Sequence, residues 1–268
     1  MTVPSLNTEY ADPASLRVRI ATHRDHSERA DDPAAAVLAA LPPTGAGDLA
    51  DIGCGDARFL ARLRAAGHSG RLVGVDTAPA MVAAANAVPG VTGVLGDISR
   101  LPFGDGEFDI CTARHMLYHV PEPVAALAEL RRVTRRGGTV AVAVNHAGTC
   151  ARTRELVCAH ARGHGLRPRS GMLNAAVHSD TLPDMMRDVF GDVMVVRYDN
   201  ALVFDRPQPL IAFAEALFSF CGVAPDEPRR GQILSDVAAA AEHWFAEHPG
   251  AVWRDPKGYS VVAATVEG

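Results

Sequence analysis

Residues 48–57 read Asp-Leu-Ala-Asp-Ile-Gly-Cys-Gly-Asp-Ala, and this stretch decides the expected fold. We expect a short strand at 48–52, because it is a short, largely apolar run that ends at turn residues. Gly53 and Gly55 then let the backbone turn tightly into a helix. A strand that passes through a glycine turn into a helix is the repeating unit of doubly wound α/β sheets.

The alternation of apolar runs and helical patterns continues to residue 145. It predicts strands at 48–52, 71–76, 91–95, 108–113 and 139–144. The last run, Thr-Val-Ala-Val-Ala-Val, has no polar alternation, as expected for a central parallel strand covered by helices on both faces. We expect the helix after Pro123 to end in Arg135-Arg136-Gly137-Gly138, where cations meet the negative end of the helix dipole.

Helices dominate the rest of the chain. They are expected at 15–26, 33–41, 149–164, 180–189, 207–220 and 227–248, with two more strands at 193–204 and 259–266. The prediction is a Rossmann-like, doubly wound, mostly parallel seven-stranded sheet with an antiparallel edge strand. It has an N-terminal helical cap (1–44), a core (45–146) and a remainder of the same domain (147–268), whose helices form a lid near the substrate edge.

Composition excludes several classes of protein. The 268 residues carry 26 Lys plus Arg against 31 Asp plus Glu, a formal charge of −5, which gives no footprint for nucleic acid. No run reaches the roughly 18 apolar residues of a membrane span, and residues 1–10 lack the pattern of an export signal. The five cysteines form no C-x-x-C pair, so we expect reduced thiols and a cytoplasmic location.

Acidic residues stand near the ends of three predicted strands. Asp51 precedes Gly53 by two positions, and Asp76 ends the second strand 21 residues after Gly55 (76 − 55), the spacing at which an acid reaches ribose hydroxyls. Asp97 follows the third strand. Because unpaired carboxylates at one sheet edge would be costly, a ligand rich in hydrogen-bond donors is the economical explanation.

These motifs together resemble the class I S-adenosylmethionine-dependent methyltransferases. The resemblance covers about residues 47–145, and the segment Arg114-His-Met-Leu-Tyr-His-Val-Pro121, with residues 16–23, resembles a bacterial small-molecule subgroup. The motifs are Asp-Ile-Gly-Cys-Gly-Asp-Ala (51–57), Gly-Val-Asp (74–76), Gly-Asp-Ile (96–98), Leu-Pro-Phe (101–103), Phe-Asp-Ile (108–110) and Arg-Arg-Val-Thr-Arg-Arg-Gly-Gly (131–138). The resemblance implies S-adenosyl-L-methionine as cofactor, S-adenosyl-L-homocysteine as product, and 45–146 as the cofactor-binding core.

The resemblance also implies roles for matching residues. Asp51 would take the ammonium of the methionine moiety, Asp76 both ribose hydroxyls, and Asp97 the adenine amino group. Met81 would pack on the adenine and the Ile98 backbone would complete the ring's edge. The implied cofactor contacts are Tyr10, Arg19, Asp51, Gly53, Cys54, Gly55, Asp76, Thr77, Met81, Asp97, Ile98 and Arg114. The family's third loop glycine is an alanine here, at position 57.

Two histidines are candidates for a catalytic base. The sulfonium already supplies the leaving group, so the protein supplies alignment and, for some acceptors, proton removal. His115 and His146 follow the fourth and fifth strands, with a substrate-contacting or structural role left open for each. His115, Tyr118 and Asn145 are expected to contact the acceptor, which we expect to be a natural product methylated on oxygen or nitrogen.

Alternatives remain at the level of sequence. A nicotinamide-dependent oxidoreductase would use Gly53, Gly55 and Asp76, but Arg58 occupies the third glycine position of G-x-G-x-x-G. A protein that binds the cofactor without methyl transfer, as a regulator or a sulfonium-assisted cyclase or decarboxylase, would look the same. The two H-x-x-x-H spacings lack the Glu and third ligand of a zinc site, so we expect no metal. The oligomeric state stays open, with a homodimer as one option.

Overall fold

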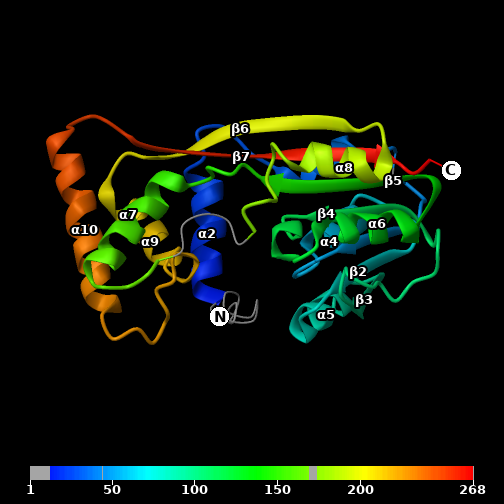
Figure 1. The fold of residues 1–268 in the computed structure, drawn as a ribbon, viewed down its shortest axis with the longest axis horizontal. Coiled ribbons are helices and arrows are strands. Elements are labelled where there is room, and N and C mark those ends of the chain that lie inside the picture. Colours follow the sequence, from blue (N-terminus) through cyan, green and yellow to red (C-terminus); the bar gives the residue numbers. More distant parts are fainter. Residues whose placement is uncertain (1–12, 44, 169–173, 268) are drawn as a thin grey trace. The chain divides into compact units, whose positions relative to one another are not determined.

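The computed structural model describes residues 13–43, 45–168 and 174–267 (Figure 1). Their contacts divide the chain into two compact units. The sheet unit comprises Asp32–Ala147, Leu173–Tyr198 and Tyr259–Gly268, and the helical unit comprises Met1–Asp31, Gly148–Met172 and Asp199–Gly258. The first boundary thus lies between residues 31 and 32, whereas the sequence places it after residue 44.

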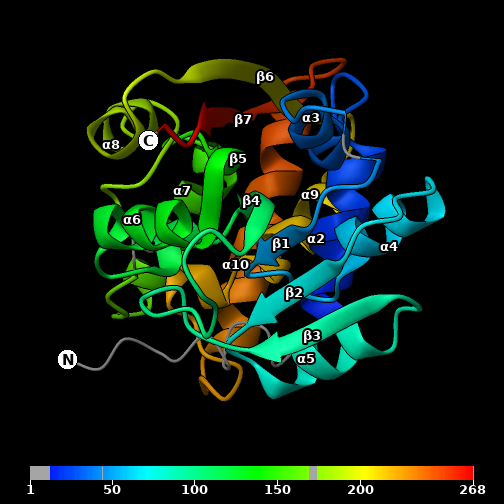
Figure 2. The ribbon, with the colours of Figure 1, turned by 90° about the vertical axis from the view of Figure 1, so that its right-hand side faces the viewer.

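Seven strands form one sheet in the order β3-β2-β1-β4-β5-β7-β6 (Figure 2). Strands β1 to β5 pair in parallel, and β7 is antiparallel to β5. This confirms the Rossmann-like sheet, with the antiparallel strand one position in from the edge. The strands are β1 (Leu49–Ile52), β2 (Leu72–Asp76), β3 (Val91–Leu95), β4 (Phe108–Arg114), β5 (Thr134–Asn145), β6 (Met194–Phe204) and β7 (Trp253–Thr265).

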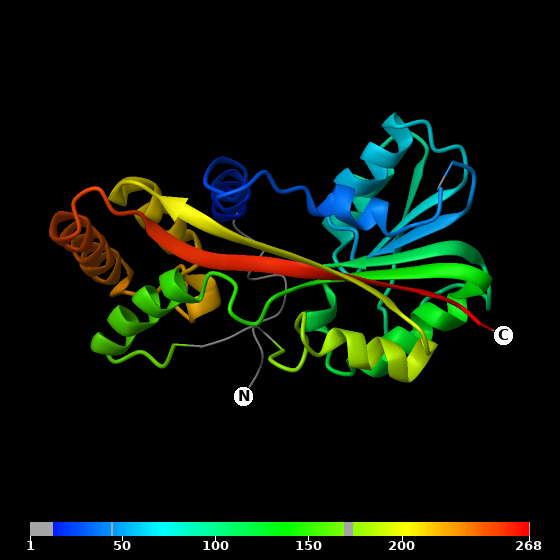
Figure 3. The same ribbon diagram turned by 90° about the horizontal axis from the view of Figure 1, so that it is seen from above.

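Strand β5 shows why the sheet is covered on both faces. Val140, Val142 and Val144 pack in one buried cluster with helices α6 (Pro123–Val133) and α8 (Leu182–Phe190). Ala141 and Ala143 alternate with them and pack in a second cluster, with residues of α3 (Pro33–Ala39), α4 (Arg58–Ala65) and α5 (Pro79–Asn86). Figure 3 shows α6 and α8 on one side of β5 and α3 and α4, in lighter blue to cyan, on the other. Two apolar faces therefore explain the absence of polar alternation.

The expected end of α6 is wrong. The helix ends at Val133, and Arg135-Arg136-Gly137-Gly138 belong to the first part of β5. A Cβ at Gly138 would lie 2.6 Å from the Asp109 carbonyl oxygen, and the Gly137 N–H donates to the Val266 carbonyl (2.8 Å). The glycines thus allow a close approach of strands beside an irregularity in β4, rather than stopping a helix.

The helical unit has its own apolar core. Helices α2 (Pro13–Asp25), α7 (Ala151–Gly163), α9 (Pro207–Ala216) and α10 (Arg230–Glu247) belong to it, with a 3-10 turn η2 (Ser219–Cys221). The side chains of Phe204, Phe213 and Phe218 are buried in this core. The Asp255 carboxylate caps the N-terminus of α7. It accepts hydrogen bonds from the N–H groups of Arg152 (3.1 Å) and Thr153 (2.7 Å). Within the part of the chain that is described, no helix combines the length and apolarity that crossing a membrane requires.

Candidate functional site

The turn after β1 is packed at one glycine and open at the other. A Cβ at Gly53 would lie 2.7 Å from both Cβ and Cγ of Met116, so only glycine fits there, at φ +71°. The N–H groups of Gly53 and Cys54 both donate to the Val75 carbonyl (2.8 and 3.0 Å), which fixes the turn against β2. A Cβ at Gly55 would meet nothing within 4 Å. The open side of the turn therefore lies at Gly55.

Asp76 lies next to this open side. Its Oδ2 accepts the Gly55 N–H (3.0 Å) and its Oδ1 accepts the Ala78 N–H (2.9 Å), so the carboxylate is held by backbone alone. Each oxygen has a second lone pair with which it can accept a further hydrogen bond. Thr77 is exposed, and Met81 is half-buried on α5. Among the described residues, Asp76 thus has the geometry expected of an acceptor for a diol.

Asp51 has a different environment. Its side chain is 0% exposed, and Arg114 binds it with two hydrogen bonds, Nε to Oδ1 (3.0 Å) and Nη2 to Oδ2 (2.7 Å). Thr112 Oγ1 also donates to Oδ1 (2.7 Å), and the Arg114 guanidinium lies 4.2 Å from the centroid of the Phe59 ring. Asp51 therefore needs no ligand to neutralise it, contrary to expectation, because Arg114 of the same chain supplies the cation.

The same ion pair fixes the charge of Arg114. Burial lowers the pKa of its guanidinium, but the Asp51 carboxylate outweighs that effect and the net pKa is raised. Cys54, whose thiol is close enough to both acids to be affected by their charge, is a neutral thiol. Burial first, and then the charges of Asp51 and Asp76, raise its pKa to about 12. Neither Cys54 nor Arg114 therefore changes its charge near neutral pH.

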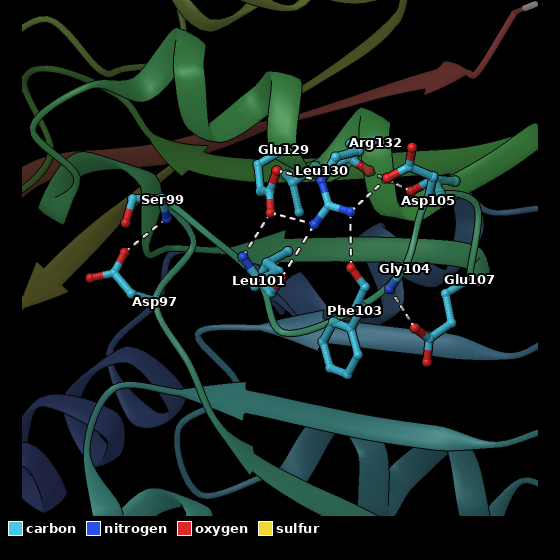
Figure 4. A network of polar contacts seen from close by, with 11 residues as sticks. Asp97, Ser99, Leu101, Phe103, Gly104, Asp105, Glu107, Glu129, Leu130 and Arg132 are labelled. Carbon is cyan, nitrogen blue, oxygen red and sulfur yellow. Dashed lines mark hydrogen bonds and ion pairs between the residues drawn. The ribbon is translucent and has the colours of Figure 1, made fainter.

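The segment after β3 is held by two side chains of α6 (Figure 4). Glu129 Oε1 accepts the Leu101 N–H (2.7 Å), and Arg132 Nη1 donates to the Phe103 carbonyl (2.9 Å). Glu129 and Arg132 also bind each other through two hydrogen bonds of 2.6 and 2.8 Å. Neither role is predicted from the sequence, although Glu129 and Arg132 have the i, i+3 spacing of neighbours on a helix.

Asp97 stands at the start of the segment after β3 and lies at the surface. Asp97 is exposed and accepts the Ser99 N–H through Oδ1 (2.8 Å), as Figure 4 shows. Ile98 is buried, with its side chain in the core on the α6 side of the sheet. Asp97 can therefore accept a donor from a ligand, while Ile98 fixes the backbone of the segment.

His115 adopts a left-handed backbone conformation, which is uncommon outside glycine. Its φ is +54°, directly after β4, and its N–H donates to the Ala143 carbonyl of β5 (2.8 Å). Its ring contacts that of Tyr259 edge to face at 5.9 Å between centroids, and Tyr259 pairs with Asn145 across β5 and β7. His115 and Asn145 therefore lie at the same end of the sheet. Strained backbone of this kind is enriched at functional sites.

The remaining polar candidates follow the same strands. His146 Nδ1 lies 2.6 Å from Ser179 Oγ, and the sequence analysis did not single out Ser179. The Tyr118 and His119 rings meet edge to face at 4.6 Å, in the 3-10 turn η1 (Leu117–His119). Burial lowers the pKa of His119 to about 4, so that imidazole is neutral at pH 7.

One implied cofactor contact, Arg19, lies outside the sheet unit, and another falls on a residue that is not described. Tyr10 falls outside the described residues. Arg19 belongs to the helical unit, where its Nη1 donates to the Ala216 carbonyl (3.4 Å) and its guanidinium lies 4.5 Å from the Phe220 ring centroid. Their contact with a cofactor stays a prediction. Among the described residues, no three His, Cys, Asp or Glu side chains are grouped so that they could hold a metal ion.

A family model and a curated relative both name methyltransferases. Residues 50–142 match a family described as a methyltransferase domain. A demethylmenaquinone methyltransferase of Roseiflexus castenholzii is 42% identical over 110 residues, which are 40% of this chain and 46% of the relative. The chain spans less than half the length of the first curated relatives that it matches.

Two solved structures share the fold. Phosphoethanolamine N-methyltransferase 2 of Haemonchus contortus, in complex with S-adenosyl-L-methionine, has a TM-score of 0.58 at 15% identity, covering 98% of this chain and 59% of that one. The [4+2]-cyclase SpnF has a TM-score of 0.57 at 16% identity, covering 95% and 93%. At these identities the likeness concerns the fold alone.

Proposed function

We propose that this protein belongs to the class I S-adenosylmethionine-dependent methyltransferases and methylates a small molecule with S-adenosyl-L-methionine, because residues 50–142 match a methyltransferase domain. The bound cofactor supplies a methyl group activated by the positive charge of its sulfur. The protein's own task is then to bind the cofactor, to align the acceptor and, where the acceptor is protonated, to remove that proton.

The observation that supports cofactor binding is the pair formed by Gly55 and Asp76. Two backbone N–H groups orient the Asp76 carboxylate beside a turn where a Cβ would meet no atom within 4 Å. A carboxylate held in this way can accept two neighbouring hydroxyls, which fits the ribose of an adenosyl group. Asp97 is suited to accept the adenine amino group, because it is exposed and stands at the start of a segment that α6 holds in place.

The ion pair of Asp51 and Arg114 suggests a shared role towards the amino-acid part of the cofactor. The Asp51 oxygens already accept three hydrogen bonds from Thr112 and Arg114. Arg114 Nη2 and Nε are occupied, but its guanidinium has five N–H donors in total. We therefore assign Asp51 to positioning of Arg114, and Arg114 to the edge where cofactor and acceptor meet.

We also propose the kind of acceptor and the residues that contact it. We propose an oxygen or nitrogen atom of a specialised metabolite, with His115, Tyr118 and Asn145 as acceptor contacts and His146 as the base. The support is positional: His115 follows β4 and His146 follows β5, at the sheet end to which Gly55 and Asp76 also belong. In open α/β sheets this end is where ligands bind.

A turnover assay tests the proposed function. The wild-type protein is incubated with methyl-labelled S-adenosyl-L-methionine and a panel of phenols, carboxylic acids and amines. The expected result is label in one acceptor together with an equal amount of S-adenosyl-L-homocysteine, and loss of both in Asp76→Ala. An acceptor that is cyclised or decarboxylated without release of S-adenosyl-L-homocysteine would instead establish a cofactor-binding protein that transfers no methyl group.

A further inference from the structure

Two cysteines of the helical unit meet in its core. Cys158 lies in the middle of α7, and Cys221 ends the 3-10 turn η2, 63 positions later (221 − 158). The two residues are 1% and 0% exposed and belong to the same buried apolar cluster. The N–H of Cys221 donates to the carbonyls of Leu217 (3.1 Å) and Phe218 (3.0 Å). The backbones of both cysteines are therefore held by hydrogen-bonded structure within one core.

One carbonyl group of α7 shows that the two sulfur atoms are close. Cys221 Sγ lies 3.9 Å from the carbonyl oxygen of Arg154. In an α-helix this oxygen accepts the N–H of the residue four positions on, which is Cys158. The Cα–Cβ bond of a helical residue tilts towards the helix N-terminus, so the Cys158 side chain leans over the turn that contains Arg154. The two thiols are in hydrogen-bond contact there.

The contact makes Cys158 the more acidic thiol of the pair. A thiol has one proton, so Cys221 donates either to the Arg154 carbonyl or to the Cys158 sulfur, and a thiolate is the stronger acceptor. The hydrogen bond from Cys221 lowers the pKa of Cys158, although burial and the charge of Glu155 oppose it. The pKa of Cys221 is raised, first by its bond to Cys158 and then by burial. Cys158 is therefore the thiol that ionises.

The pKa values of the other three cysteines move the opposite way. Burial raises the pKa of Cys54 and of Cys111 to about 12, and it also raises the pKa of Cys150. The thiolate, and not the thiol, is the form that attacks an oxidant. An oxidant small enough to enter the core of the helical unit should therefore react at Cys158, where a second sulfur is already in contact.

We propose that Cys158 and Cys221 are a redox-active pair, which hydrogen peroxide converts into a disulfide between α7 and η2. The inference does not rest on the proposed methyl transfer, because both residues belong to the helical unit. The disulfide closes a loop of 63 positions (221 − 158), and such a cross-link stabilises a protein mainly by restricting its unfolded chain. The oxidised protein is therefore expected to unfold at a higher temperature than the reduced protein.

The proposed step is balanced. The Cys158 thiolate attacks one oxygen of the peroxide, the O–O bond breaks, and the hydroxide that leaves takes up the proton that Cys158 released. The Cys221 sulfur then attacks the sulfenic acid on Cys158. The S–S bond forms, the S–O bond breaks, and the departing hydroxide takes the Cys221 proton. The two thiols are thus oxidised to one disulfide, and the peroxide is reduced to water.

Peptide mass mapping of the full-length protein tests the pair. The folded protein is treated with hydrogen peroxide, its remaining thiols are alkylated under denaturing conditions, and it is digested without reductant. We expect one linked pair of peptides, which contain Cys158 and Cys221, an intact mass lowered by two hydrogen atoms, and reversal by dithiothreitol. A folded protein in which another pair is linked, or in which both thiols can still be alkylated after the treatment, would overturn the proposal.

Single variants separate the pair from general oxidation. Cys158→Ser should abolish the cross-link, and in Cys221→Ala the Cys158 sulfur should gain oxygen atoms instead. The matched control is Cys111→Ala, which removes an equally buried thiol of the sheet unit and should leave the cross-link as in wild type. If a variant of the pair does not fold, the map of the wild-type protein still decides.

Thermal unfolding tests the consequence of the cross-link. Peroxide treatment should raise the melting temperature of the wild type by several degrees, and dithiothreitol should return it to the starting value. The same treatment should not raise the melting temperature of Cys221→Ala. An equal rise in this variant would show that the stabilisation comes from another oxidation and would contradict the role of the pair.

Discussion

Two carboxylates at the ends of neighbouring strands, Asp51 and Asp76, have opposite surroundings. Asp51 is fully buried and binds a side-chain cation, Arg114, with support from Thr112. Asp76 is half-buried, and among the described residues it accepts hydrogen bonds from backbone N–H groups alone, those of Gly55 and Ala78. The difference teaches that an acid at this edge is not by itself a ligand contact: one carboxylate stabilises the site and the other remains able to receive a ligand.

The largest expected effect comes from breaking the buried ion pair. Asp51→Ala leaves the Arg114 guanidinium buried without its partner, which costs about 3–5 kcal/mol in the free energy of unfolding. Chemical denaturation measures this loss. The matched control is Asp184→Ala, whose partner Arg187 is exposed, and which should change stability by at most about 1 kcal/mol. Equal losses in the two variants would contradict the structural role of Asp51.

The second effect concerns binding. Asp76→Ala should raise the Kd for S-adenosyl-L-homocysteine by about tenfold to a few hundredfold, because two charge-assisted hydrogen bonds to the ligand are lost. Its free energy of unfolding should fall less than that of Asp51→Ala, since only backbone contacts are removed from a half-buried group. Titration and denaturation of the two variants together test the comparison; the reverse order of stability losses would reject it.

A third effect depends on pH. The folded pKa of His119 is lowered by burial to about 4, whereas the unfolded chain binds that proton near 6.5. The stability due to the neutral ring is therefore complete above about pH 6.5 and is lost as the pH falls towards 4, by roughly 1–3 kcal/mol. Melting temperatures from pH 7 to 4.5 should fall less steeply in His119→Gln. Parallel curves for wild type and variant would show that His119 is not the group responsible.

The smallest effect concerns the turn between β1 and α4, which follows Asp51 and contacts Asp76. Ala57 is buried and is the N-cap residue that precedes α4, at φ +58°, a left-handed conformation that costs an alanine roughly 1–2 kcal/mol. Ala57→Gly should therefore change stability by about 1 kcal/mol or less, as relief of strain is offset by greater freedom of the unfolded chain. Thermal unfolding measures this change. A loss above about 2 kcal/mol would mean that the Ala57 methyl is needed for packing.

Much of the fold could be predicted because it depends on local patterns. The run of valines and alanines in β5 predicted a strand buried on both faces. The glycine turn at 53–55 predicted that the strand β1 leads directly into a helix, which is α4. The end of α6 was predicted wrongly because arginine followed by glycine, as at Arg135 and Gly137, is typical both of a helix C-terminus and of an irregular strand. Only the pairing with β4 and β7 distinguishes the two.

The residues of the site could be predicted from the sequence, but the hydrogen-bond partners of several of them could not. Asp51, Asp76 and Arg114 were all named, yet the pairing of Asp51 with Arg114 depends on the parallel register that sets Asp51 opposite Thr112. Glu129 and Ser179 were missed because their partners lie 28 and 33 positions away along the chain. The periodicity of one segment cannot predict contacts between residues that lie so far apart in the sequence.

One titration tests the central claim that this sheet edge binds an adenosyl sulfonium cofactor. Calorimetry with wild-type protein should give saturable, one-to-one binding of S-adenosyl-L-homocysteine and no binding of NADH. A folded protein that gives no heat with S-adenosyl-L-homocysteine or S-adenosyl-L-methionine would contradict the account.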